Sequence, residues 1–423
     1  MLIYILFIAV FMRCFLLMVF MYTKNYTIKD SGLIEYDQYI YYNSAVNLSK
    51  GKGYTISFTD QEQQGQIHDA FKPSSIPNTY YNNFFPPVYP FFLSILFYFF
   101  GTSILVYAVP QIILGTVSCY LTYHIAREAF SSKIGLMACF LLAIYQPIAW
   151  WVSYVRTENL FIPLQLIAII FLIKAIKNNL DVKNIALSGV FLAVSFLCRN
   201  TILYLPIFVA IYFFVIFFRV GIKRLIYCTT ILLLSFYIPL LPWGYRNYNT
   251  HDKFSITTSE KWDAFSVCNN VSQADAPFFE TYEIKDTPTV IATGEYDKKK
   301  ASMDFVKKYP LKYLKLCVKR FIAYWGPITQ KPSFIRKVID TLVYIIVFPM
   351  AFYGFYRSKW WVNAAGTGFK PVLILLMTVI LYYSILHTAV ALDDNLVYRY
   401  PIIPLICIFS AYGYYEYFKL SNH

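Results

Sequence analysis

The chain has 423 residues, of which 58% are hydrophobic and only 14% are charged. This composition leaves too little polar surface for a soluble globular protein of that length, so it predicts a polytopic membrane protein. The formal net charge of +14 would suggest nucleic-acid binding in a soluble protein. Here the basic residues fall between hydrophobic segments, where membrane topology explains them, and no nucleic-acid partner is predicted.

Apolar runs of about 20 residues, the length that crosses a bilayer, occur about ten times along the chain. They lie near 1–22, 103–124, 134–152, 158–176, 184–198, 200–218, 224–243, 338–356, 371–391 and 400–417. The first run is longer than a signal-peptide core and lacks a small-residue cleavage site. We therefore expect it to be an uncleaved signal anchor.

The run 86–100 is short, aromatic and opened by prolines, and the loop charges decide its placement. If it does not cross the membrane, the basic loops near 127–133, 174–183, 219–224 and 357–370 all share one side with Lys419. That is the positive-inside pattern, so these loops and both termini are predicted to be cytoplasmic. Residues 86–100 are then an interfacial or re-entrant element of a multi-pass protein of the plasma (inner) membrane.

This topology divides the chain into three parts. Residues 1–243 form a transmembrane core with a first outer loop at 23–100, residues 244–337 form an extracytoplasmic α/β region, and 338–423 hold the C-terminal spans. In the first loop we expect a helix at 36–48, ended by Gly51 and Gly53, and then a long loop at 55–83. In the second we expect a β-like stretch at 254–258 and an amphipathic helix near 301–319.

The cysteines do not define a disulfide framework. Six of the eight lie in apolar runs and are expected to be core residues. Cys268 and Cys317 lie in the long polar region and could form a bridge if that region faces an oxidising compartment.

Charged residues at the predicted extracytoplasmic ends of the spans are the candidates for chemistry. Asp37 follows the first span, and a carboxylate held just outside a membrane can act on a lipid-borne substrate. Four arginines break the positive-inside bias, and their planar guanidinium groups suit a lipid phosphate, although each could be an interfacial anchor; they are Arg156, Arg199, Arg246 and Arg399. Glu158 could place a second carboxylate near Asp37 or could cap a helix. Arg13, inside the first span, needs a polar partner or a route to the interface.

Other kinds of site have weaker support. The pairs His68-Asp69 and His251-Asp252 lack the spacing of a metal site. The chain has no phosphate-binding Gly-rich loop, hydrolase elbow or HExxH motif. No metal ligand is assigned, and the sequence demands no cofactor while leaving a divalent metal ion open.

Several segments together resemble the bacterial polyprenyl-phosphate-sugar-dependent glycosyltransferases of the GT-C superfamily, which include protein mannosyltransferase-like and aminoarabinose transferase-like enzymes. The matching pieces are Arg13, Asp37 to Tyr54, Phe85-Pro-Pro-Val-Tyr-Pro90 leading to Phe100-Gly101, Arg156-Thr-Glu-Asn-Leu-Phe161, Arg199, Pro242 to Tyr248 and Arg399 to Pro404. The first loop has Asp37-Gln38 where the protein mannosyltransferases commonly have an Asp-Glu pair, and the C-terminal half is short for an aminoarabinose transferase. These departures bear on the acceptor more than on the reaction.

The resemblance implies a GT-C-like helical bundle with juxtamembrane helices in the first outer loop. It implies that Asp37 is the catalytic carboxylate, that Glu158 holds the second acidic position, and that the lipid-phosphate donor binds at the outer face. It also assigns four residues to the substrate-binding loop: Tyr41, Asn47, Tyr54 and Tyr89.

The sequence therefore favours an inverting glycosyltransferase. It would move a sugar from a polyprenyl-phosphate donor to a hydroxyl on a lipid, glycan or protein acceptor, with Asp37 as base and the arginines stabilising the leaving phosphate. Two alternatives stay open: an envelope polysaccharide polymerase, ligase or lipid-linked saccharide transporter, and a non-catalytic membrane scaffold.

Overall fold

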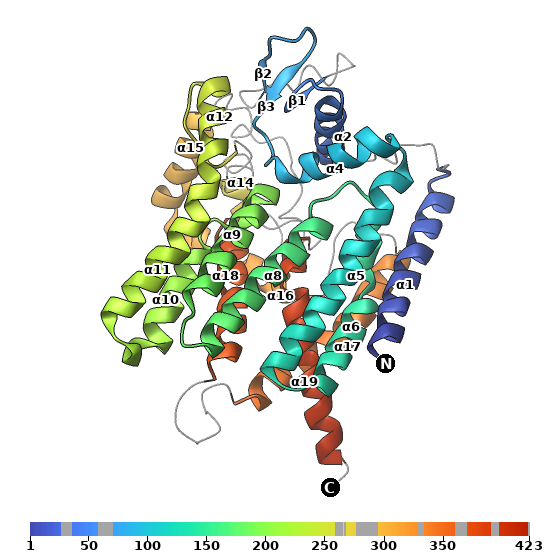
Figure 1. The fold of residues 1–423 in the computed structure, drawn as a ribbon, viewed down its shortest axis with the longest axis vertical. Coiled ribbons are helices and arrows are strands. Elements are labelled where there is room, and N and C mark those ends of the chain that lie inside the picture. The colour runs from blue at the N-terminus through green and yellow to red at the C-terminus, as the bar shows by residue number, and fades with distance from the viewer. Residues whose placement is uncertain are drawn as a thin grey trace.

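The computed structural model describes residues 1–26, 36–57, 71–258, 265, 268–275, 295–327, 334–359, 370–390 and 397–421. Helices dominate these residues, and one continuous apolar core runs through the bundle (Figure 1). The predicted fold class, an all-α polytopic membrane protein, is confirmed.

The helices follow the apolar runs of the sequence. They are α1 (Leu2–Thr23), α2 (Tyr36–Ser49), α4 (Val88–Phe100), α5 (Ile104–Ala129), α6 (Ser132–Ala143), α7 (Gln146–Ala149), α8 (Glu158–Lys177), α9 (Val182–Cys198), α10 (Leu205–Ile216), α11 (Ile222–Tyr237), α12 (Leu241–His251), α14 (Val271–Asp275), α15 (Glu295–Lys308), α16 (Pro310–Trp325), α17 (Phe334–Arg357), α18 (Pro371–Ala389) and α19 (Ile403–Ser421). Short 3₁₀ helices lie between them: η1 (Trp150–Ser153), η2 (Asn200–Ile202), η3 (Phe218–Val220), η4 (Ile238–Leu240) and η5 (Val397–Ile402).

Among the described residues, six helices are long and apolar enough to cross a membrane, and a seventh crossing results if one bent pair counts as a single span. The apolar helices 88–100, 182–198 and 200–216 are shorter. The expected number of about ten spans therefore stays a prediction. Helix α4 has only 13 residues, which at 1.5 Å per residue is too short to cross the hydrocarbon core. That length agrees with the interfacial or re-entrant placement predicted for it.

The predicted span 134–152 is bent rather than straight. Helix α6 ends at Ala143, and the following segment Gln146–Ser153 turns by 56°. Pro147 explains the break, because it has no N–H to donate to the Ala143 carbonyl four residues earlier and is well tolerated in the first turn of a new helix. The turn between η1 and α8 consequently lies inside the bundle, where η1 packs against α1 and α5.

The first loop is more ordered than the sequence suggested. The predicted helix at 36–48 is α2, and both Gly51 and Gly53 adopt positive φ angles after its end. The segment 55–83, expected to be a loop, contributes a small antiparallel sheet in the order β1 (Thr55–Ile56), β3 (Tyr80–Asn82), β2 (Phe71–Pro73). Because the strands have only two or three residues each, alternation of apolar and polar residues could not reveal them.

In the second outer loop, the described residues are less regular than the sequence suggested. The stretch 254–258 is irregular and not a strand, so the prediction of β structure there is wrong. The helix expected near 301–319 is two helices, α15 and α16, separated at Tyr309. Pro310 causes this break, because a proline disfavours helical geometry in the residue before it, here Tyr309. No disulfide joins Cys268 to Cys317, since all eight cysteines, which lie among the described residues, are thiols.

The sheet, α2 and α4 lie together over one end of the bundle, which we call the sheet end (Figure 1). The start of α1 and the end of α19 lie away from it, as expected for termini that share one side of a membrane. The α2–β3 region, residues 36–57 and 71–82, contacts the bundle through an exposed salt bridge of 2.7 Å between Lys72 and Asp252.

Candidate functional site

Asp37 lies in the first turn of α2, at the sheet end. Its side chain is 43% exposed, and its Oδ2 atom lies 3.6 Å from Nη1 of Arg156. Arg156 belongs to the turn before α8, so the ion pair connects the first loop to the bundle. The structure therefore brings the predicted base and one predicted phosphate-binding arginine together.

Arg156 also contacts an aromatic side chain of the bundle. Its guanidinium lies over the ring of Trp151 at 5.0 Å, within the range of a cation–π interaction, and only 13% of its side chain is exposed. The Trp151 indole donates a hydrogen bond of 2.8 Å to the Tyr400 hydroxyl on η5. Tyr400 adjoins Arg399, so this contact joins the turn before α8 to the segment before α19.

Glu158 begins α8 two residues later and forms an ion pair with Arg199 at the end of α9. Arg199 also donates to the Thr157 hydroxyl at 3.3 Å, and its guanidinium lies 5.4 Å from the ring of Tyr398. Only 2% of the Glu158 side chain is exposed. A buried, paired carboxylate is poorly placed to exchange protons with a substrate, so Glu158 is better suited to orient Arg199 than to act as a second base.

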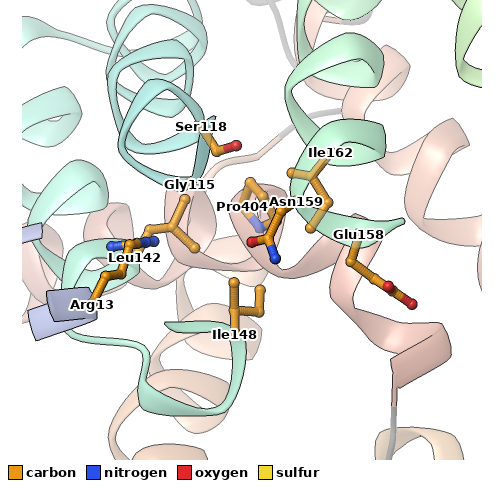
Figure 2. Close-up of a pocket in the computed structure, with 9 residues that line it drawn as sticks. All are labelled: Arg13, Gly115, Ser118, Leu142, Ile148, Glu158, Asn159, Ile162 and Pro404. Atoms are coloured by element: carbon orange, nitrogen blue, oxygen red, sulfur yellow. The ribbon is translucent and has the colours of Figure 1, made fainter. Parts of the chain in front are cut away.

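A small pocket extends from this ion pair into the bundle (Figure 2). Arg13 lines one side of it and Glu158 the other, with Gly115, Ile148 and Asn159 between them, and the Glu158 carboxylate points away from Arg13 (Figure 2).

Arg13 itself is 1% exposed in the middle of α1. It donates to the Ala9 carbonyl at 3.0 Å and to the Cys119 sulfur at 3.7 Å, and no carboxylate is among these partners. Its Nε atom has no hydrogen-bond partner among the described residues. A Cβ atom at Gly115 would lie 2.5 Å from that Nε, so α5 carries glycine where the arginine passes. Arg13 is thus a buried cation for which α5 makes room, next to the site.

The four residues predicted for the substrate-binding loop are all buried and hold the first loop together. Tyr41 stacks on Phe85 at 4.3 Å, and Asn47 donates to the Thr55 carbonyl and hydroxyl. Tyr54 donates to the Phe85 carbonyl at 2.9 Å, and Tyr89 donates to the Gln111 side chain at 3.2 Å. These contacts make them positioning residues for α2 and α4, and leave direct contact with substrate a prediction that the geometry does not favour.

The remaining two arginines bind backbone carbonyls. Arg246 donates to the carbonyls of Asn82 and Tyr54 at 2.8 and 3.1 Å and lies over the Trp243 ring at 5.0 Å, so it fastens the α2–β3 region to α12. Arg399 is buried and donates to the carbonyls of Tyr324 and Gly326 at the end of α16. Of the four predicted arginines, Arg156 and Arg199 pair with the acids, whereas Arg246 and Arg399 contact protein carbonyls.

Residues 85–243, less than half of the chain, match the dolichyl-phosphate-mannose-protein mannosyltransferase family. No curated protein sequence matches the chain. The solved structures similar to it include the oligosaccharyltransferase AglB from Archaeoglobus fulgidus, in complex with an inhibitory peptide and a dolichol-phosphate. The identity is 15% and the TM-score 0.59, over 99% of this chain and 50% of AglB. A second is ArnT from Cupriavidus metallidurans bound to undecaprenyl phosphate, with 11% identity and a TM-score of 0.54, over 90% of this chain and 56% of ArnT.

This chain has the GT-C glycosyltransferase fold. The resemblance predicted from the motifs is confirmed, and AglB and ArnT share the fold although the chain spans only about half of their lengths. The family match starts at Phe85 and ends at Trp243, and so contains Arg156, Glu158 and Arg199 but not Asp37.

Two groups of residues that support this candidate site were not predicted from the sequence. One is Trp151, whose ring lies against the Arg156 guanidinium. The other is Gln111 with Asn159, whose side-chain amides donate hydrogen bonds to backbone carbonyls of the segment before Arg156. Gln111 was detectable in principle, because an amide inside an apolar span must find hydrogen-bond partners. Among the described residues no group of three or more His, Cys, Asp or Glu side chains could hold a metal ion. Asp252 pairs with Lys72, while His68 and Asp69 lie outside the described residues.

Proposed function

We propose that this protein is an inverting glycosyltransferase that moves a sugar from a polyprenyl-phosphate donor to a hydroxyl acceptor at the extracytoplasmic face of the plasma membrane. The observation that carries the proposal is the partly exposed Asp37 carboxylate held beside Arg156, with the Glu158–Arg199 pair two residues further along the chain. The GT-C fold supports it, as do the lipid phosphates bound by AglB and ArnT.

In the proposed reaction Asp37 accepts the proton of the acceptor hydroxyl as its oxygen attacks the anomeric carbon. The bond from that carbon to the phosphate oxygen breaks, and its electron pair leaves with polyprenyl phosphate. Because attack comes from the face opposite the phosphate, the anomeric configuration inverts. A positioned base is typically worth about 10²–10⁴-fold in rate.

The charge balance of the site favours an anionic donor. Within the part of the chain that the structure describes, the carboxylates beside Arg13, Arg156 and Arg199 are those of Asp37 and Glu158. One positive charge is therefore in excess in a largely buried setting, where electrostatic attraction is stronger than in water. Arg156 and Arg199 are the arginines we assign to the phosphate, and their guanidinium groups suit its oxygens.

The test is a transfer assay on the full chain in lipid nanodiscs, with a panel of labelled polyprenyl-phosphate hexoses and pentoses and with lipid, glycan and peptide acceptors. Asp37→Asn should abolish transfer, whereas Asp252→Asn, which removes an exposed acid of the same region, should leave it unchanged. Full activity of Asp37→Asn would refute the assignment of the base. Movement of lipid-linked sugar across the membrane without a new glycosidic bond would refute the reaction class in favour of a transporter. Parallel assays with and without a chelator would decide whether a divalent cation takes part.

A further inference from the structure

Gln111 is a polar side chain in the interior of α5, one of the candidate membrane spans, and it is 0% exposed. A buried amide is costly unless its donors and acceptors are satisfied. Its Nε2 atom donates to the carbonyls of Val152 and Tyr154 at 3.1 and 2.9 Å. Its Oε1 atom accepts from the Tyr89 hydroxyl at 3.2 Å and from Asn159 Nδ2 at 3.1 Å. All four hydrogen bonds that a glutamine can make are thus used.

These partners all belong to the surroundings of the proposed site. Val152 and Tyr154 lie in the turn that leads to Arg156, and Asn159 donates in addition to the Trp151 carbonyl at 3.1 Å. The chain leaves helical geometry here, since Tyr154 is extended. Its carbonyls cannot find intrahelical partners, and two amide side chains supply them instead.

The fourth partner of Gln111, Tyr89, connects it to the part of the site that holds Asp37. Tyr89 is in α4, and its ring makes an edge-to-face contact of 5.4 Å with Tyr41 in α2. Tyr41 follows Asp37 by four residues, so the two side chains lie on the same face of α2. Gln111 therefore contacts the turn that carries Arg156 directly and the helix that carries Asp37 through two tyrosines.

We infer that Gln111 is a positioning residue that sets the distance between Asp37 and Arg156. This inference rests on the proposed function, because a fixed distance between base and arginine matters only if the two act on one substrate. The side chain does not touch substrate; it fixes the two elements on either side of it.

The test compares Gln111→Leu and Gln111→Glu with wild-type protein and with Tyr212→Phe. Tyr212 is a matched control, because its buried hydroxyl also joins two helices, through the Pro371 carbonyl, and is not part of the proposed site. A displacement of about 1 Å can cost on the order of 10²-fold in rate. We expect Gln111→Leu to lower kcat by about that factor with little change in KM for the donor, while Tyr212→Phe keeps wild-type kcat.

Gln111→Glu gives a readout that loss of packing would not. Burial raises the pKa of a glutamic acid. When protonated, the new side chain can donate to one carbonyl of the turn; when ionised, it can donate to none. The kcat of this variant should therefore fall as pH rises through that raised pKa, an additional limb that wild type lacks. Wild-type kcat and pH profile in both variants would overturn the inference.

A structural measurement separates this inference from the proposed function. Val155 is fully buried in the same turn, so a Val155→Cys thiol should react slowly with a maleimide, as followed by mass spectrometry of its peptide. Adding Gln111→Leu should speed that reaction, and adding Tyr212→Phe should not. If wild type transfers no sugar, the proposed function fails while the labelling rates still decide whether Gln111 holds the turn. Equal labelling rates in all three proteins would overturn it.

Discussion

The carboxylate of Asp37 and the guanidinium of Arg156 meet at 3.6 Å, and this pair joins α2 to the turn before α8. The distance is longer than that of a charge-assisted hydrogen bond, about 2.7–2.9 Å. The Arg156 guanidinium also lies over the Trp151 ring. The arrangement leaves part of the Asp37 carboxylate accessible, which a base that must reach an acceptor hydroxyl requires.

Arg156→Lys should therefore lower transfer even though the charge is retained. A lysine lacks the planar group that lies over Trp151, so the ammonium would not be fixed beside Asp37. We expect a fall in kcat on the order of 10-fold for lysine and more for alanine, since a cation–π contact contributes from about 0.5–1 kcal/mol at an exposed site to about 2 kcal/mol when desolvated. Steady-state kinetics with a labelled donor measures this.

Arg127→Lys is the control for that experiment. Arg127 is exposed and pairs with Glu128 near the end of α5, far along the helix from the site. It should keep wild-type kinetics. Equal activity of Arg156→Lys and wild type would show that the planar contact with Trp151 has no part in the reaction.

Variants of the Glu158–Arg199 pair should affect stability and transfer activity differently. Removing one partner of a buried ion pair leaves the other charge uncompensated, which typically costs about 3–5 kcal/mol. Because Arg199 is 16% exposed, we expect Glu158→Gln to lose toward the lower end of that range. The double variant Glu158→Gln/Arg199→Gln should regain stability but not transfer, since the phosphate would lack an arginine. Thermal unfolding and transfer assays on the four proteins of the cycle measure both, and recovery of transfer in the double variant would contradict the role of Arg199.

The parts of the fold predicted from sequence are those with a strong local signal. The apolar runs predicted the long helices, and the pair Gly51 and Gly53 predicted the end of α2, because each signal is contained in a few neighbouring residues. The strands at 55–56 and 80–82 were missed because their stability depends on pairing across the loop rather than on local sequence.

The site was predicted by residue type more successfully than by role. The side of the membrane assigned to each loop brought Asp37, Arg156, Glu158 and Arg199 into one group, and the structure places them in two neighbouring ion pairs. The same reasoning could not tell that Arg246 and Arg399 bind carbonyls, because those partners are distant in sequence and carry no side-chain signature. Whether an arginine side chain is buried against protein carbonyls or available to a ligand is decided by the folded structure, so the sequence alone does not distinguish these roles.

Arg13 should influence affinity for the donor more than it influences stability. A buried charge without an opposite charge beside it is costly, so replacing it by an unbranched apolar side chain of similar length should not lower stability. Arg13→Met should therefore unfold at the wild-type temperature or above. It should also bind polyprenyl phosphate more weakly, because it removes the excess positive charge of the site. Affinity for uncharged polyprenol should not change.

Gly115→Val is the companion to Arg13→Met. A side chain at this position would occupy the path of the arginine, so the variant should be less stable than wild type. Combining it with Arg13→Met should recover part of that loss, because methionine is flexible and uncharged. If Arg13→Met bound polyprenyl phosphate as tightly as wild type, the buried cation would have no part in attracting the donor.

For Arg246 the sequence predicted a phosphate-binding role, whereas its contacts indicate that it anchors the α2–β3 region. Its planar guanidinium donates to two backbone carbonyls and lies over the Trp243 ring, a geometry that lysine cannot reproduce. Arg246→Lys should then loosen the α2–β3 region, seen as faster proteolysis there, and should lower kcat because α2 carries Asp37. A phosphate-binding Arg246 would instead give a lysine variant with wild-type proteolysis and a raised KM for the donor. Lys72→Ala, which removes the exposed salt bridge to Asp252 in the same region, is the matched control and should change proteolysis less, since an exposed ion pair contributes little.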